Sequence, residues 1–225
     1  MHTEPLQNGR TVLVDDTCTF GIDAVLLSAF SAPYATARSC DLGTGCGIIP
    51  LLWELPSTAT VDAVDCSAHA VSLVQQTVQQ NGLDDSITVR KEDWCNLSLP
   101  HGAYRCVVSN PPYFAQNSGK VSVDADRRLA RHETETTLSD VVIAAAQLLQ
   151  NGGHFCLCHR PERLVDVLTV LRTHRLEPKR LQWVHARRDT APFLFLCDAV
   201  KNGKPSLSVL SPCFIEEETC LCPAP

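Results

Sequence analysis

The stretch Asp41-Leu-Gly-Thr-Gly-Cys-Gly47 decides the fold, because it reads as a tight turn between a short strand at 37–41 and a helix at 48–54. Glycine lacks a side chain and lets a backbone pass close to a ligand. The spacing is G-x-G-x-G, not the G-x-G-x-x-G of dinucleotide-binding turns. The preceding carboxylate would repel a pyrophosphate but attract a cation. We therefore expect a positively charged ligand to bind Asp41, Gly43, Gly45 and Gly47.

Apolar strand-like segments alternate with helical segments around this turn. Strands separated by such helices indicate βαβ units and a parallel sheet, and a short final connector indicates an antiparallel hairpin. We predict an α/β fold: a mostly parallel seven-stranded sheet with an antiparallel hairpin at its C-terminal end and helices on both faces. The strands are expected at 37–41, 60–65, 87–90, 106–109, 154–159, 180–186 and 193–198, with a further short strand at 11–15. The helices are expected at 23–31, 48–54, 67–81, 138–149 and 161–173.

Composition points to one domain. The 225 residues are 44% hydrophobic and 20% charged, so the chain has enough apolar material to bury a core. No repeat or linker divides it, and we expect a single domain over residues 1–225. Within that domain, the polar stretch 115–137 has no periodicity and is expected to be a mobile substrate loop. Residues 213–225 are expected to form a tail.

Two further acids follow the next two strands. Asp65 ends the second strand, 18 residues after Gly47, close to the offset at which an acid binds ribose hydroxyls. Asp93 lies just past the third strand, in Lys-Glu-Asp-Trp. Either acid alone reads more simply as a solvated charge or a helix cap. Ligands of parallel sheets bind outside the carboxyl ends of the strands, so together with Asp41 the two acids predict a cofactor site.

The fourth strand ends in Asn110-Pro-Pro-Tyr113-Phe114. Two consecutive prolines cannot continue a sheet ladder, and they stiffen the backbone. A planar amino group could donate hydrogen bonds to the side-chain oxygen of Asn110 and to the carbonyl of Pro111. Those bonds would pull its nitrogen toward sp3 character and free the lone pair for attack. Tyr113 could stack on a base that has left its helix.

These motifs resemble those of the Rossmann-like methyltransferases that depend on S-adenosylmethionine (SAM) and modify amino groups. The glycine turn is similar to their motif I, and Asn110-Pro-Pro-Tyr113 to their motif IV, D/N-P-P-Y/F/W. The resemblance implies a Rossmann-like methyltransferase fold and SAM as the cofactor. It implies catalytic roles for Asn110, Pro111, Pro112 and Tyr113. The cofactor-binding residues would be Asp41, Gly43, Gly45, Gly47, Asp65, Asp93 and Asn110.

Other segments resemble one bacterial family, the tRNA1(Val) (adenine(37)-N6)-methyltransferases. They are Phe20-Gly-Ile-Asp23, Ala130-Arg-His-Glu133 and His159-Arg-Pro-Glu-Arg-Leu164, with support from 176–181 and 208–212. The resemblance spans most of the chain. It implies N6 methylation of adenosine 37, beside the anticodon, and tRNA as the partner. From the residues alone, Asp23 reads as a helix cap, whereas the resemblance places 20–23 over the cofactor.

The charge is unevenly distributed. A net charge of −6 argues against bulk coating of nucleic acid. Residues 1–126 hold 6 Lys and Arg against 14 Asp and Glu, while residues 127–225 hold 13 against 11. Several arginines follow Tyr113 and could contact phosphates, although a solvated basic loop reads equally well. The expected RNA-binding residues are Phe114, Arg127, Arg128, Arg131, Arg160 and Arg163.

The chain has 12 cysteines but no zinc-ligand pattern. There is no Cys-x-x-Cys, and the Cys-x-Cys pairs at 156/158 and 220/222 lack a second pair at the right spacing, so no metal is expected. Most cysteines lie in apolar runs, where reduced Cys behaves as a small hydrophobe.

With neither a signal peptide nor an apolar run of about 18 residues, we expect a cytoplasmic protein, without a membrane segment. We also expect a monomer that needs no obligate protein partner.

The residues alone do not identify the molecule that accepts the methyl group. A protein-glutamine N5-methyltransferase usually carries an extra N-terminal helical domain, whereas only 40 residues precede Asp41 here. Guanine-N2 rRNA and DNA adenine methyltransferases share the Asn-Pro-Pro signature. A SAM-binding module without catalysis is the alternative from another class, and the intact Asn110-Pro-Pro-Tyr113 argues against it. An N6-adenine tRNA methyltransferase is the favoured hypothesis.

Overall fold

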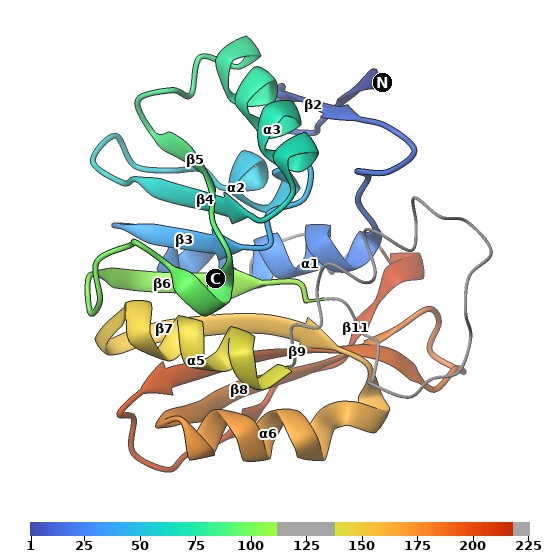
Figure 1. Cartoon of the computed structure of the whole chain (residues 1–225). Helices are drawn as coiled ribbons and strands as arrows, with labels where there is room; N and C mark the ends of the chain where they lie inside the picture. The colour runs from blue at the N-terminus through green and yellow to red at the C-terminus, as the bar shows by residue number, and fades with distance from the viewer. Residues whose placement is uncertain (112–137, 218–225) are drawn as a thin grey trace, which may run out of the picture.

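The computed structural model describes residues 1–111 and 138–217, and one large sheet forms its centre (Figure 1). Seven of the strands run side by side in the order β5-β4-β3-β6-β7-β9-β8. Their bounds are β3 (Ser39–Leu42), β4 (Val61–Asp65), β5 (Ile87–Lys91), β6 (Tyr104–Ser109), β7 (Leu149–His159), β8 (Leu176–His185) and β9 (Pro192–Lys201).

The sheet has the predicted mixture of strand directions. Strands β5, β4, β3, β6 and β7 pair in parallel, and β9 pairs antiparallel with both β7 and β8. The predicted fold class, with its C-terminal antiparallel hairpin, is therefore confirmed. Two short strands, β10 (Ser208–Val209) and β11 (Cys213–Phe214), extend the sheet by parallel pairing with β8. The segment assigned to a tail from residue 213 thus begins inside the sheet and continues into the 3-10 helix η4 (Ile215–Glu217).

Helices cover both faces because side chains alternate along each buried strand. Val107 and Val108 are neighbours in β6, yet they belong to two different hydrophobic clusters. One cluster includes residues of three helices, which are α1 (Ile22–Ser31), α2 (Ile48–Leu52) and α3 (Ala68–Gln80). The other includes residues of α5 (Leu138–Leu148) and α6 (Leu164–Thr173). This is the predicted arrangement of three layers.

Helix α3 has the ends that its sequence predicts. The Ser67 side chain accepts a hydrogen bond from the backbone N of Ala70 at 3.3 Å and caps the first turn. The helix stops at Asn81, and Gly82 follows with a φ of +63°. The side chain of Asn81 bonds both backbone groups of Thr11, through a donor at 2.8 Å and an acceptor at 2.9 Å.

Those bonds anchor a small N-terminal hairpin on α3. The strand expected at 11–15 is β2 (Thr11–Val14), and it pairs antiparallel with β1 (His2–Pro5), which the sequence analysis did not predict. Because β2 pairs with β1 in a separate two-stranded sheet, it is not an edge strand of the main sheet. The hairpin therefore covers α3, whose other side packs on the sheet.

A buried carboxylate connects three strands in the half of the sheet where the parallel strands begin. Asp62 in β4 accepts hydrogen bonds from Arg90 of β5 at 2.5 Å and from the hydroxyl of Tyr104 of β6 at 2.7 Å. Arg38, just before β3, adds a third at 3.0 Å. Burial by itself raises the pKa of the Asp62 carboxyl, but these three bonds outweigh burial and lower it.

Nine cysteines in the described ranges are free thiols, and most of them are buried. The tenth, Cys213, is disulfide-bonded, which departs from the expectation of reduced cysteines. No helix in the described ranges is both long and apolar enough to cross a bilayer.

The glycine turn can be tested by a matched pair of alanine substitutions. Gly47 and Gly45 have φ values of +80° and +56°. A Cβ on Gly47 would lie 2.9 Å from Cγ1 of Val74 in α3, whereas a Cβ on Gly45 meets nothing within 4 Å. We expect Gly47→Ala to lower the free energy of unfolding by about 2 to 4 kcal/mol, and Gly45→Ala by about 1 to 2 kcal/mol. Urea unfolding measures both, and equal losses would contradict the close contact with α3.

Candidate active site

The candidate site lies where three parallel strands end. Strand β3 is flanked by β4 and β6, and Asp41 in β3 is in register with Ala63 of β4 and Val108 of β6. The glycine turn, Asp65 and Asn110 follow directly at the carboxyl ends of these strands. The strand order reverses here, because β3, β4 and β5 follow one another in one direction and the chain then returns to place β6 on the other side of β3. Open α/β sheets bind ligands where the strand order reverses in this way.

The glycine turn is held by backbone bonds to the end of β4. The backbone N–H groups of Gly43 and Thr44 both donate to the carbonyl of Val64 at 2.9 Å. The N–H of Gly45 donates to Oδ2 of Asp65, also at 2.9 Å. The left-handed backbone at Gly43, Gly45 and Gly47 allows this path. The turn and Asp65 therefore form one structural unit, as their order in the sequence predicts.

Asp41 is fully buried, and only half of its carboxylate is bonded. The hydroxyl of Thr44 donates to Oδ2 at 2.7 Å. Oδ1 has no hydrogen-bond partner within residues 1–111 and 138–217. Burial, with a smaller contribution from the charge of Asp65, raises the pKa of Asp41 to about 7. A buried polar atom without a partner is costly, which makes Oδ1 a candidate contact for a bound group.

Asp65 is the second acid of the site and is half-buried. Oδ2 accepts from Gly45, and Oδ1 accepts from the backbone N of Ser67 at 2.9 Å. Burial raises the pKa of Asp65, and these backbone hydrogen bonds oppose the shift. Backbone donors of three residues, Gly45, Cys66 and Ser67, bond a carboxylate that has about four acceptor positions, so Asp65 can still accept a hydroxyl proton.

Asp93 differs from the other two acids because it is exposed. Its Oδ1 accepts from the backbone N of Cys95 at 2.9 Å and caps the 3-10 helix η2 (Trp94–Asn96). The neighbouring Trp94 is buried, and a Cβ on Gly43 would lie 3.4 Å from its ring. The segment after β5 thus lies against the glycine turn.

Asn110 directly follows β6, and hydrogen bonds fix the orientation of its side chain. Its amide nitrogen donates to Oδ2 of Asp23 at 3.1 Å, and its amide oxygen accepts from the thiol of Cys158 at 3.1 Å. Because a carboxylate only accepts, the NH2 side of the amide must face Asp23. The preceding Ser109 donates to the carbonyl of Leu42 at 2.8 Å, which places Asn110 beside the start of the glycine turn.

Two of these partners were not in the predicted site. The sequence suggests a cap role for Asp23, but the N-cap position of α1 is Gly21 and Asp23 lies in the first helical turn. Its Oδ1 accepts from the backbone N of Ala24 at 3.0 Å, and its Oδ2 accepts from Asn110. Cys158 lies fully buried in β7, next to β6. The resemblance of 20–23 to cofactor-covering segments was the available signal for Asp23. An apolar Cys-x-Cys run offers no such signal for Cys158.

The other residues predicted for the site either lie near the carboxyl ends of the parallel strands or fall outside the described ranges. Pro111 is buried directly after Asn110. Arg160 is exposed just past β7, with Nη1 3.4 Å from the carbonyl of Phe193. Arg163 is half-buried and pairs with Asp166 at 2.7 Å. The residues outside the described ranges are Pro112, Tyr113, Phe114, Arg127, Arg128 and Arg131.

His159 is a further buried polar residue at this edge. Its Nδ1 accepts from the backbone N of Arg160 at 2.8 Å. Burial, reinforced by the positive charge of Arg163, lowers the pKa of His159 to about 4. The ring is therefore neutral at physiological pH and holds the backbone at the start of η3 (Pro161–Arg163).

Known structures share this fold. A predicted O-methyltransferase of Agrobacterium tumefaciens superposes with a TM-score of 0.66 at 19% identity, covering 85% of this chain and 86% of that one. The precorrin-6y C5,15-methyltransferase of Geobacter metallireducens superposes with a TM-score of 0.58 at 11% identity, covering 84% and 94%. At these identities the likeness concerns the fold alone.

Proteins related by sequence identify the family of this chain. The family model "Methyltransferase small domain" matches residues 16–168. The tRNA1(Val) (adenine(37)-N6)-methyltransferase of Parabacteroides distasonis is 30% identical over 201 residues, which are 87% of this chain and 84% of the relative. The enzyme of that name from Tolumonas auensis is 30% identical over 177 residues, covering 73% of each. The chain therefore belongs to the methyltransferase small domain family and, within it, to the family of the tRNA1(Val) (adenine(37)-N6)-methyltransferases.

Proposed function

We propose that this chain transfers a methyl group from SAM to the N6 atom of an adenine in tRNA, at a position equivalent to adenosine 37 of tRNA1(Val). The observation that carries the proposal is the oriented amide of Asn110 at the end of β6, beside the glycine turn. The names of the relatives supply the acceptor.

The residues at the glycine turn fit SAM. The unbonded Oδ1 of Asp41 is an acceptor for the cationic amino acid end of the cofactor. Open space beside Gly45 leaves room for a close approach to the backbone. Asp65 keeps lone pairs for ribose hydroxyls, and Asp93 lies beyond β5 for the adenine ring. When bound there, SAM supplies a methyl group on a sulfonium centre.

Asn110 positions the acceptor nitrogen. Its Oδ1 accepts a hydrogen bond from the amino group, and because an amide oxygen has two lone pairs, the Cys158 thiol can remain bonded. The backbone carbonyl of Pro111 offers a second acceptor. Two such bonds draw the nitrogen toward sp3 geometry and direct its lone pair. Asp23 keeps the NH2 side of Asn110 turned away from the substrate.

Catalysis in this scheme is positioning, without a covalent intermediate on the protein. Tyr113 is proposed to stack on the adenine, and Phe114, Arg127, Arg128, Arg131, Arg160 and Arg163 to contact the RNA. The surplus proton passes to solvent or to a backbone carbonyl after transfer.

The acceptor can be identified by labelling. Purified protein with radiolabelled SAM is offered total tRNA, total protein and DNA in parallel, and the labelled fraction is digested to nucleosides or amino acids. We expect label in tRNA as N6-methyladenosine. Label in protein alone, or as methylated guanine, would exclude the proposed acceptor.

Removing the amide separates catalysis from cofactor binding. Asn110→Ala should lower kcat by at least about 100-fold, because it removes a preorganised transition-state contact. The Kd for SAM, measured by calorimetry, should stay within about twofold, since the carboxylates that bind the cofactor's charges remain.

Asp65→Ala is the matched comparison. It removes the carboxylate that holds the Gly45 N–H, so SAM affinity should fall by about tenfold or more. A loss of SAM affinity in Asn110→Ala, with none in Asp65→Ala, would reverse the proposed roles.

SAM affinity should depend on pH through Asp41. The pKa of this carboxyl is about 7 in the free protein and about 4 in an unfolded chain. The group is therefore protonated in the folded state below pH 7, and only its ionised form attracts a cation. We expect the Kd for SAM to rise by up to about tenfold per pH unit as the pH falls below 7.

Asp41→Asn should bind SAM weakly at every pH and remove this dependence. Its fold should stay intact, because a carboxyl with a raised pKa lowers stability as the pH rises above about 4, and the amide carries no such charge. An unchanged pH profile in Asp41→Asn would show that another group titrates.

A further inference from the structure

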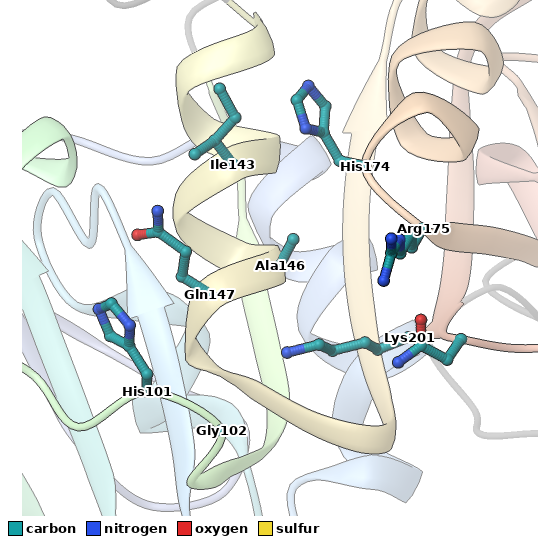
Figure 2. A pocket seen from close by; sticks show the side chains of 9 residues that line it. His101, Gly102, Ile143, Ala146, Gln147, His174, Arg175 and Lys201 are labelled. Carbon is teal, nitrogen blue, oxygen red and sulfur yellow. The ribbon is translucent and has the colours of Figure 1, made fainter.

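A pocket opens where β6 and β8 begin and β9 ends, at the opposite end of the parallel strands from the glycine turn. Its volume is about 550 Å3, within the usual range for ligand sites. Figure 2 shows its walls: the loop before β6, the second half of α5, the turn from α6 into β8, and the end of β9. Neither the glycine turn nor Asn110 contributes to it, and no role proposed above involves its lining.

The polar lining is basic and contains no acid. His101, His174, Arg175 and Lys201 line the pocket, with the amides of Gln147 and Asn202. None of the residues recorded in its lining is Asp or Glu. The nearby Glu177 of β8 is paired with Arg172 at 3.2 Å. In a chain whose net charge is −6, this is a local concentration of positive charge.

Helix ends account for only part of this charge. α5 and α6 both end beside the pocket, and the negative ends of helices favour basic side chains. Lys201 has such a role, because its ammonium donates to the carbonyl of Leu149 at 2.6 Å. The guanidinium of Arg175 has no hydrogen bond or ion pair to any residue in the described ranges, so it is available for a ligand.

The backbone at Arg175 gives independent support. Within the described ranges, Arg175 and Asn202 are the only non-glycine residues with positive φ, at 61° and 56°. They are bonded to each other, since the N–H of Asn202 donates to the carbonyl of Arg175 at 2.8 Å. Residue 175 directly follows the cap of α6, where glycine is the usual residue. Arginine is strained there, which is expected where the side chain is needed for a ligand.

We propose that this pocket binds a phosphate group, with the guanidinium of Arg175 as its main contact. A guanidinium presents paired donors that match phosphate oxygens, and the imidazoles and amides around it supply further donors. The phosphate can come from an RNA backbone or from a small phosphorylated molecule. The inference does not depend on the proposed methyl transfer, because binding alone tests it.

Arg175→Gly is the decisive variant, because glycine suits the left-handed backbone. Its melting temperature should not fall below that of the wild type, so lost binding cannot be attributed to unfolding. The matched control is Lys204→Ala, which removes one positive charge from an exposed residue near the same edge but outside the pocket. Both are compared with the wild type for binding of a short RNA hairpin, by fluorescence anisotropy, and of inorganic phosphate, by calorimetry.

We expect Arg175→Gly to weaken binding by about tenfold or more, and Lys204→Ala by less than about twofold. Loss of hairpin binding alone identifies an RNA backbone as the source, and the slope of log affinity against log salt should then fall by about one. Loss of phosphate binding alone identifies a small phosphorylated ligand, and loss of both supports a site open to either. Unchanged binding in Arg175→Gly, or an equal loss in Lys204→Ala, would overturn the proposal.

Discussion

The left-handed turn from Gly43 to Gly47 is the constraint on which the site depends. It has to leave β3, bond the end of β4 and start α2 while passing within contact distance of Val74 in α3. Only residues without a Cβ follow that path without strain at three positions. In doing so the turn exposes backbone beside a buried carboxylate, so the same geometry that joins the layers also forms the proposed cofactor site.

The fold was predictable because buried parallel strands and amphipathic helices leave strong local patterns. The glycine turn, the cap at Ser67 and the stop at Gly82 marked the element boundaries correctly. Strand β2 was expected, but its partner β1 was missed because the hairpin is stabilised by distant contacts, such as those of Asn81, that sequence patterns do not record. For the same reason the late strands β8 and β9 extend beyond the segments expected from their apolar residues.

Residues of the candidate site were predictable where both the residue type and its position at a strand end indicate a ligand contact. Asp41, Asp65 and Asn110 follow strands whose carboxyl ends meet, so their proximity could be expected. The partners of Asn110 could not, because Asp23 and Cys158 come from an early helix and a late strand and have simpler local readings. A side-chain amide turns its NH2 group toward a neighbour that can only accept hydrogen bonds, such as a carboxylate. Which residue is that neighbour becomes known only from the folded structure.

The carboxylate of Asp62 has a consequence for motion within the sheet. It accepts bonds from Arg90, Tyr104 and Arg38 three residues before Asp65, or roughly 10 Å along the strand. If β4 slid by one residue against either neighbour, this buried charge would lose its donors, which is costly. The strands therefore share one register, which fixes Asp41 and Asp65 relative to each other, and movement at the site is left to the segments beyond the strand ends, where the glycine turn and Asn110 lie.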